Sequence, residues 1–176
     1  MICFDQDGVL AVYERDAYNF DSKEGPRFLQ EGYFRTVKPN ITAIKLLEKC
    51  MEVCPNDTYI ITTVPNVPNK NDIVMDKLFW ITSYIPRFNI GTQFIAPTDA
   101  KMTFIEWIRG SSITQRDVLI DDYNPNLYSW ATRGGTAIKF INGLNHIETW
   151  AGDCLDGTVF DADNLFKLLM SYVIKP

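Results

Sequence analysis

Two carboxylates stand one residue apart near the start of the chain, in the segment Phe4-Asp5-Gln6-Asp7-Gly8. Asp and Gly are common turn residues, so one interpretation is a strand that runs into a polar turn. The other interpretation is a catalytic loop that holds a metal ion. Polar residues much later in the sequence decide between the two, provided that the fold brings them to the same place.

Short apolar runs precede most of these polar residues. Apart from Lys139, each run is continuously apolar and ends abruptly, which is typical of a strand buried on both faces of a sheet. The runs are 2–4 before Asp5, 59–61 before Thr62-Thr63, 94–96 before Pro97, 118–120 before Asp121-Asp122, and 137–140 shortly before Asn142-Gly143.

Helical patterns lie between the apolar runs. Apolar residues recur at helical spacing in 41–51, 74–85, 104–108, a segment that opens at Asn124-Pro125, and 165–173. Asn40 is a good N-cap for the first of these segments, and the proline after Asn124 favours a helix start there. Strands that alternate with helices predict an α/β fold, with a Rossmann-like parallel sheet and helices on both of its faces.

Residues 11–38 show no clean helix or strand period, and they mix aromatic with charged side chains. We therefore expect a small cap inserted after the first strand, over the crevice at the end of that strand. The predicted organisation is a core formed by residues 1–10 and 39–176, with residues 11–38 as the cap.

The carboxyl ends of parallel strands lie at one edge of a sheet, where α/β proteins bind their ligands. The residues expected at this edge are Asp5, Asp7, Asp121 and Asp122, with Thr62 or Thr63 beside them. Unpaired carboxylates would repel one another there, and a hard divalent cation removes the repulsion. We therefore predict a Mg²⁺ site with Asp5 and Asp121 as carboxylate ligands and a backbone carbonyl from position 7.

Such a site can carry out phosphoryl transfer. The carboxylate of Asp5 can attack phosphorus and form an aspartyl-phosphate. Asp7 returns to the same face of the chain, because strand-like geometry has a period of two, and it can protonate the leaving oxygen and later deprotonate water. Gly8 allows the backbone to approach the phosphate closely.

Two further side chains can support the same chemistry. A hydroxyl from Thr62 or Thr63 can donate to the phosphate, and both positions stay open as candidates. Lys101, at a predicted helix start, can supply a fixed positive charge at the same edge.

The composition restricts the partners. A chain of 176 residues suffices for one domain, and the net charge of −5 disfavours a broad surface for long nucleic acid. No apolar run is long enough to span a bilayer, and the N-terminus lacks the layout of a signal peptide. The four cysteines follow no zinc spacing and are interpreted as reduced thiols. We therefore expect a cytoplasmic protein that binds a small molecule and does not bind a membrane. A homodimer is a further possibility for its assembly.

The segment Asp5-Gln6-Asp7-Gly8-Val9-Leu10 resembles motif I of the haloacid dehalogenase (HAD) superfamily of phosphohydrolases. Thr62 or Thr63 resembles motif II, Lys101 motif III, and Val118-Leu119-Ile120-Asp121-Asp122 motif IV, in the family's order. The resemblance implies a Rossmann-like core with a cap after motif I, and Mg²⁺-dependent dephosphorylation through an aspartyl-phosphate. It implies that Asp5 is the nucleophile, Asp7 the general acid and base, and Asp121 a metal ligand, with Asp122 either near the metal or orienting Lys101.

The chain is similar in more detail to the 5'(3')-deoxyribonucleotidases and their bacterial and phage-type relatives. The similarity lies in Asp-x-Asp-Gly-Val-Leu, Gly32-Tyr33-Phe34-Arg35, Lys38-Pro39 before a helix, residues 76–80, and Ile120-Asp121-Asp122 ahead of Asn124 and Trp130. It implies a (deoxy)nucleoside 5'-monophosphate substrate, with Phe34 packing on the nucleobase; the alternative for Phe34 is the cap core. Arg35 would bind either phosphate or a cap carboxylate. The insertion is shorter than in the animal enzymes, and Val64 stands where they have a second hydroxyl, so the substrate pocket differs from theirs.

Three other functions fit parts of the pattern. A HAD phosphatase for another small phosphometabolite, such as a sugar phosphate, or for a nucleic-acid end would use the same motifs. An Asp-x-Asp glycosyltransferase would leave Lys101 and Asp121-Asp122 without a role. A catalytically silent phosphatase-like binding protein is disfavoured because motif I lacks none of its residues.

Overall fold

The sheet at the centre of the protein has six parallel strands in the order β3-β2-β1-β4-β5-β6. The computed structural model describes residues 1–12, 14, 17, 21, 26–98, 100–144 and 149–173. The strands are β1 (Ile2–Phe4), β2 (Thr58–Ile61), β3 (Phe94–Ile95), β4 (Val118–Asp121), β5 (Thr136–Ile141) and β6 (Cys154–Asp156). The parallel sheet confirms the predicted α/β fold. β6 is absent from the predicted strands because Leu155 is its single fully buried residue, so it forms no apolar run.

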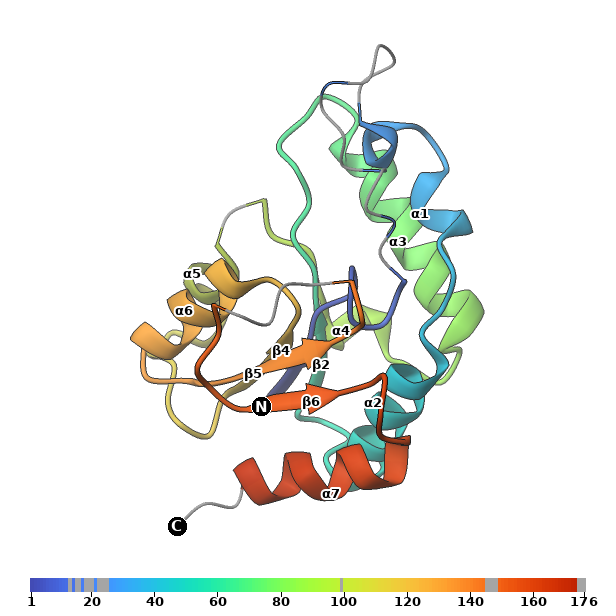
Figure 1. The fold of residues 1–176 in the computed structure, drawn as a ribbon. Helices are drawn as coiled ribbons and strands as arrows, with labels where there is room; N and C mark the ends of the chain where they lie inside the picture. Colours follow the sequence, from blue (N-terminus) through green and yellow to red (C-terminus); the bar gives the residue numbers. More distant parts are fainter. Residues whose placement is uncertain are drawn as a thin grey trace.

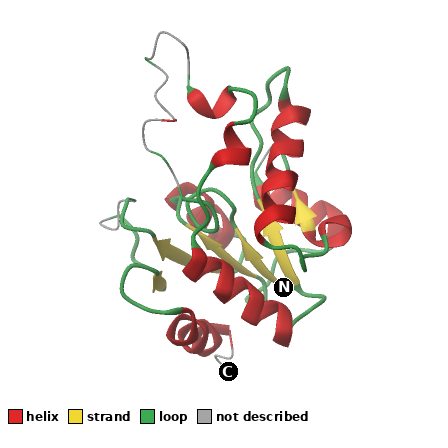
Figure 2. Ribbon diagram, turned by 90° about the vertical axis from the view of Figure 1, so that its right-hand side faces the viewer, coloured by secondary structure: helices red, strands yellow, loops and turns green. Residues whose placement is uncertain are grey.

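Helices cover both faces of the sheet, as predicted (Figures 1 and 2). The α-helices are α1 (Tyr33–Thr36), α2 (Ile41–Val53), α3 (Lys70–Tyr84), α4 (Ile90–Gln93), α5 (Lys101–Arg109), α6 (Asn124–Thr132) and α7 (Ala162–Val173), with a 3-10 turn, η2, at Arg27–Leu29. Among the described residues, no helix combines the length and the apolar composition that a membrane span requires.

Alternation along the strands divides the core into two clusters. Phe4 packs with apolar residues of α2 and α7 on one face. Cys3 packs with apolar residues of α5 and α6 on the other. The side chain of Asn40 accepts a hydrogen bond from the backbone N–H of Ala43 at 3.3 Å, so it caps α2 as expected.

The described part of the predicted cap packs against α3, and Figure 1 shows α1 beside this helix. Asp76 of α3 accepts hydrogen bonds from the backbone N–H of Gly32, at 2.8 Å, and from Nε of Arg35, at 2.5 Å. The indole N–H of Trp80 donates to the carbonyl of Val37 at 2.7 Å. Much of the 11–38 segment lies outside the described residues, so its boundaries as a cap stay a prediction.

The buried carboxylate of Asp117, just before β4, contacts the end of α5 and the loop that follows it. Oδ2 of Asp117 accepts hydrogen bonds from the backbone N–H and the hydroxyl of Thr114, at 2.8 and 2.9 Å. Oδ1 pairs with the guanidinium of Arg109 at 2.7 Å. Burial acts to raise the pKa of Asp117, but Arg109 and Thr114 outweigh it, so the pKa lies below its ordinary value.

Asp117→Asn should therefore lower the free energy of unfolding at pH 7 by about 1–2 kcal/mol. A depressed pKa contributes stability above the unfolded-state pKa, and this contribution is lost as the pH falls through the folded-state value. Urea unfolding should thus show a gap between wild type and Asp117→Asn that is largest near neutral pH and shrinks towards pH 3. Asp72→Asn, an exposed change in the first turn of α3, is the control, and an equal gap at both pH values would contradict the assignment.

Candidate active site

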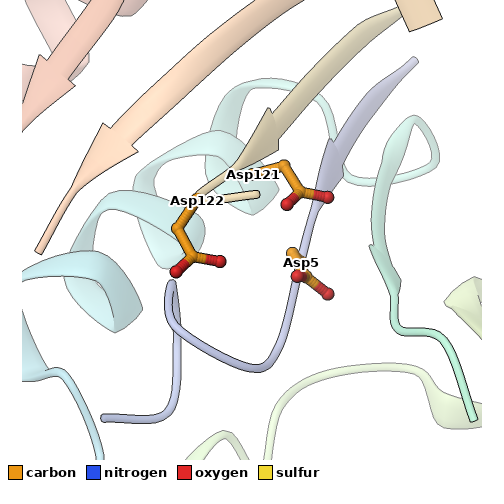
Figure 3. A group of neighbouring side chains, drawn as sticks. All are labelled: Asp5, Asp121 and Asp122. Atoms are coloured by element: carbon orange, nitrogen blue, oxygen red, sulfur yellow. The ribbon is translucent and has the colours of Figure 1, made fainter. Parts of the chain in front are cut away.

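Three carboxylates meet at the carboxyl edge of the sheet, where strand order reverses. β1 and β4 are neighbours, with Phe4 in register with Ile120, so Asp5 emerges beside Asp121. Asp5, Asp121 and Asp122 each offer one carboxylate oxygen, and these oxygens lie within 4.8 Å of one another (Figure 3). The fold thus brings together the acids of the two segments that the sequence singled out.

Lys101 bridges two of these carboxylates from the start of α5. Its ammonium lies 2.8 Å from Oδ1 of Asp5 and 2.6 Å from Oδ2 of Asp121. The side chain is buried, and burial acts to lower its pKa, but the charges of Asp121 and Asp5 outweigh burial and raise the pKa above its ordinary value. Lys101 is therefore a fixed cation inside the carboxylate cluster.

Hydrogen bonds fix some carboxylate oxygens and leave others available. Asp121 accepts from the backbone N–H of Tyr123 at 2.8 Å and from the amide of Asn126 at 3.0 Å, in addition to Lys101. Oδ1 of Asp5 accepts from the backbone N–H of Gln6 at 2.8 Å. Within the described residues, Oδ2 of Asp5 and Oδ1 of Asp122 have no hydrogen-bond partner. These oxygens can meet a ligand without first breaking a bond.

Burial makes full ionisation of the cluster costly even with Lys101 beside it. Burial raises the pKa of Asp5 well above its ordinary value, against the lowering effect of Lys101, and the neighbouring carboxylates raise it further. Burial, followed by the charge of Asp121, raises the pKa of Asp122 to about 7. A bound divalent cation would reverse both shifts, because it favours the ionised carboxylates.

Asp7 lies beside this cluster in an ion pair that was not predicted. Its Oδ2 pairs with the ammonium of Lys77 from α3, and the hydroxyl of Thr62 lies 3.3 Å from the same oxygen. Lys77 also donates to the hydroxyl of Thr62 at 2.8 Å, and its ammonium stands 4.1 Å from the centre of the Phe34 ring. A carbonyl ligand from position 7 stays a prediction.

The position of Lys77 in α3 explains why it was missed. The predicted apolar stripe of this helix ran through Val74 and Leu78, but the buried face is the one that carries Ile73, Lys77 and Trp80. Ile81 and Ile85 of the predicted stripe are buried, whereas Val74 and Leu78 are only partly buried. A lysine at helical spacing between two large apolar residues is the signal that could have identified a buried functional cation.

The two threonines after β2 differ in their exposure to solvent. Thr62 is fully buried and its hydroxyl contacts Asp7 and Lys77, whereas Thr63 is exposed. Side chains alternate along extended backbone, so only one of two adjacent hydroxyls can face the carboxylates. Of the two candidates, Thr62 is the one beside the acids.

The two cap residues have partners of their own. Phe34 is 4% exposed, and the ammonium of Lys77 lies over its ring. Arg35 pairs with the cap-facing carboxylate of Asp76, and its guanidinium lies 5.3 Å from the centre of the Phe79 ring. Of the two partners considered for Arg35, the carboxylate is the one it contacts, and contacts of either residue with a substrate stay predictions.

Gly8 permits the close approach of the loop after β1 to Asp122. Its φ is +83°, and a Cβ atom at this position would lie 2.3 Å from Oδ2 of Asp122. Gly8→Ala should cost about 1–2 kcal/mol for the left-handed backbone and should also displace the Asp122 carboxylate. Gly32→Ala is the matched control, because Gly32 has a φ of +78° with no atom near its Cβ position.

Gly8→Ala should lose at least as much stability as Gly32→Ala in urea unfolding, and only Gly8→Ala should weaken Mg²⁺ binding in a calorimetric titration. Equal Mg²⁺ affinity in the two variants would show that the space left by Gly8 does not determine the position of the Asp122 carboxylate.

The chemistry of the donor set fits a magnesium ion. Octahedral Mg²⁺ holds oxygens at about 2.1 Å, which places adjacent ligand atoms about 3 Å apart and opposite ones about 4 Å apart. The oxygens of Asp5, Asp121 and Asp122 lie within 4.8 Å of one another, so they would have to move closer together to bind the ion at these separations. A set of carboxylates without nitrogen or sulfur ligands suits a hard cation.

A separate cavity of about 570 Å³ opens elsewhere, near the amino end of β2, with Glu48, Tyr59, Arg87 and Gln93 among its lining residues. None of the three clustered carboxylates lines this cavity. We therefore assign the chemistry to the carboxylate cluster and not to the cavity.

Solved structures match the fold of this chain, although no model of a protein family and no curated protein sequence matches it. A HAD hydrolase of family IA, variant 3, from Entamoeba histolytica HM-1:IMSS has a TM-score of 0.58 at 13% identity, over 96% of this chain and 98% of that one. A HAD family hydrolase from Deinococcus radiodurans R1, solved with bound phosphate and sodium, has a TM-score of 0.62 at 13% identity, over 97% and 95%. The chain therefore has the fold of these hydrolases over nearly its whole length.

Proposed function

We propose that this protein is a Mg²⁺-dependent phosphomonoesterase of the HAD superfamily that hydrolyses a small phosphorylated metabolite through an aspartyl-phosphate. The observation that carries the proposal is the convergence of Asp5, Asp121 and Asp122 around a buried lysine at the carboxyl edge of a parallel sheet. The order of the four HAD-like motifs along the chain and the fold shared with HAD hydrolases support it. One of these hydrolases was solved with bound phosphate.

Asp5 acts as the nucleophile in this proposal. Its Oδ2, which has no hydrogen-bond partner among the described residues, attacks phosphorus, and the bond from phosphorus to the leaving oxygen breaks. Asp7 donates a proton to the leaving oxygen. In the second half of the reaction Asp7 takes a proton from water, the water oxygen attacks phosphorus, and the bond between phosphorus and Asp5 breaks.

The cations of the site stabilise the phosphoryl oxygens. Lys101 holds Asp5 in place, and Lys77 can turn from Asp7 towards phosphate together with the hydroxyl of Thr62. This movement would free Asp7 for proton transfer. Mg²⁺ held by Asp5, Asp121 and Asp122 would neutralise charge on the phosphoryl group.

A (deoxy)nucleoside 5'-monophosphate is the substrate that we propose first. The similarity of motif I and of residues 32–35 to deoxyribonucleotidases supports it. The contact of Phe34 with Lys77 supports it as well, because it places an aromatic ring beside a lysine that could bind the phosphate group. A sugar phosphate is the competing substrate.

Phosphate release from a panel of deoxynucleoside and nucleoside 5'-monophosphates, 3'-monophosphates and sugar phosphates tests the proposal. We expect turnover of at least one nucleoside monophosphate with Mg²⁺, and none in EDTA. If only sugar phosphates are hydrolysed, the proposed reaction is kept and the proposed substrate is replaced by a sugar phosphate. No release from any monoester with Mg²⁺ present would reject the proposed activity.

A further inference from the structure

Asn142, the first residue after β5, connects the two loops that carry the carboxylates. Its side-chain nitrogen donates hydrogen bonds to the carbonyl oxygen of Gly8, at 2.8 Å, and to Oδ2 of Asp122, at 3.2 Å. Its side-chain oxygen accepts from the backbone N–H of Leu144 at 2.9 Å. Because the oxygen faces an N–H donor, the orientation of the amide is determined, and its NH₂ group faces Gly8 and Asp122.

Lys139 of β5 contacts the main chain of Asp122. Its ammonium donates to the carbonyl oxygen of Asp122 at 3.1 Å and also contacts the side-chain oxygen of Asn124. Lys139 is 1% exposed, and in the sheet it pairs directly with Asp121 of β4. β5 and the residue after it therefore support Asp122 twice, at its backbone through Lys139 and at its carboxylate through Asn142.

Asp122 depends on this support more than its neighbours do. The carboxylates of Asp5 and Asp121 are both tied to Lys101. Within the described residues, Asp122 makes no ion pair, and Asn142 is the only side chain that donates to its carboxylate. That hydrogen bond restrains rotation of the carboxylate and occupies one oxygen, which leaves the other for a ligand.

We propose that Asn142 is a positioning residue for the metal site, which orients the carboxylate of Asp122 towards Mg²⁺ and ties it to motif I through Gly8. The inference rests on the proposed function in that it takes the carboxylate cluster as a Mg²⁺ site. Side chains that orient metal ligands by hydrogen bonds commonly contribute tenfold or more to metal affinity. Because Asn142 directly follows β5, a rigid element anchors the side chain that restrains the ligand.

The test is Asn142→Leu, which keeps the side-chain volume and removes both hydrogen-bonding groups. In calorimetric titrations of the free protein with Mg²⁺, the dissociation constant should rise about tenfold or more. Asn164→Leu is the matched control, since Asn164 lies exposed in α7, far along the chain from the cluster, and should titrate like wild type. Asn142→Ala serves as a second variant if the leucine variant fails to fold.

A purely structural role would predict a different pattern, namely a lower melting temperature in EDTA with unchanged Mg²⁺ affinity. If the panel gives turnover, excess Mg²⁺ should return kcat of Asn142→Leu to within about twofold of wild type, because only positioning of the metal is impaired. Wild-type Mg²⁺ affinity in a folded Asn142 variant, or no Mg²⁺ binding by wild type, would overturn the inference. Weakened Mg²⁺ binding in a protein that hydrolyses no monoester would retain the inference and reject the proposed activity.

Discussion

Asp5→Asn should abolish phosphate release from every monoester that the wild type hydrolyses, with a loss of kcat of roughly 10⁴-fold or more. Asparagine keeps the size of the side chain and the oxygen that accepts from Gln6 and contacts Lys101. It replaces the free oxygen by an NH₂ group, which cannot form a phosphoryl ester. The loss should therefore come from chemistry and not from unfolding.

The stability of Asp5→Asn provides an independent check. Since burial raises the pKa of Asp5, the folded state binds a proton more tightly than the unfolded state. Stability then falls as the pH rises above the ordinary carboxyl pKa, because the ionised form is disfavoured in the fold. Without Mg²⁺ at pH 7, Asp5→Asn should unfold at an equal or higher urea concentration than wild type.

Acid-quenched reactions with ³²P-labelled substrate measure the covalent step directly. Wild type should retain label on the protein, Asp5→Asn should retain none, and the exposed Asp72→Asn should behave like wild type. Turnover by Asp5→Asn at the wild-type rate would exclude an aspartyl-phosphate at this position.

The convergence of Asp5 and Asp121 could be predicted because it follows from topology. The residues that follow parallel strands lie at the same edge of the sheet. Two acids that each follow a strand must therefore lie close together if the two strands are neighbours. The choice between Thr62 and Thr63 could not be made from the sequence, because both follow the same run. Side chains alternate between the two sides of an extended backbone, so only one of the two hydroxyls faces the carboxylates. Which one does so depends on the exact residue at which β2 ends.

Lys77 and Asn142 were not predicted because their roles depend on packing between distant segments. Lys77 reaches Asp7 because the buried face of α3 carries it. The apolar pattern of this helix instead included Val74 and Leu78, which are only partly buried. Asn142 follows a predicted strand, but its contacts with Gly8 and Asp122 depend on β5 lying next to β4. Strand order of this kind is not contained in local periodicity.

Asp7→Asn should reduce turnover by an amount that depends on the leaving group. An alcohol such as the 5'-oxygen of a nucleoside must be protonated as it departs, whereas p-nitrophenolate leaves as a stable anion. We expect a loss of roughly 10²–10⁴-fold for nucleoside monophosphates and a much smaller loss for p-nitrophenyl phosphate when formation of the aspartyl-phosphate is measured in single turnovers.

Lys77→Met is the control that separates proton transfer from loss of the ion pair. Both variants remove the ion pair between Asp7 and Lys77, but Lys77→Met keeps the carboxyl group that donates the proton. If Lys77 binds phosphate, its loss should lower the rate by a similar factor for both leaving groups, because the phosphoryl group is the same in each. A similar factor for both leaving groups in Asp7→Asn would instead assign Asp7 to charge balance with Lys77, and another group would have to protonate the leaving oxygen.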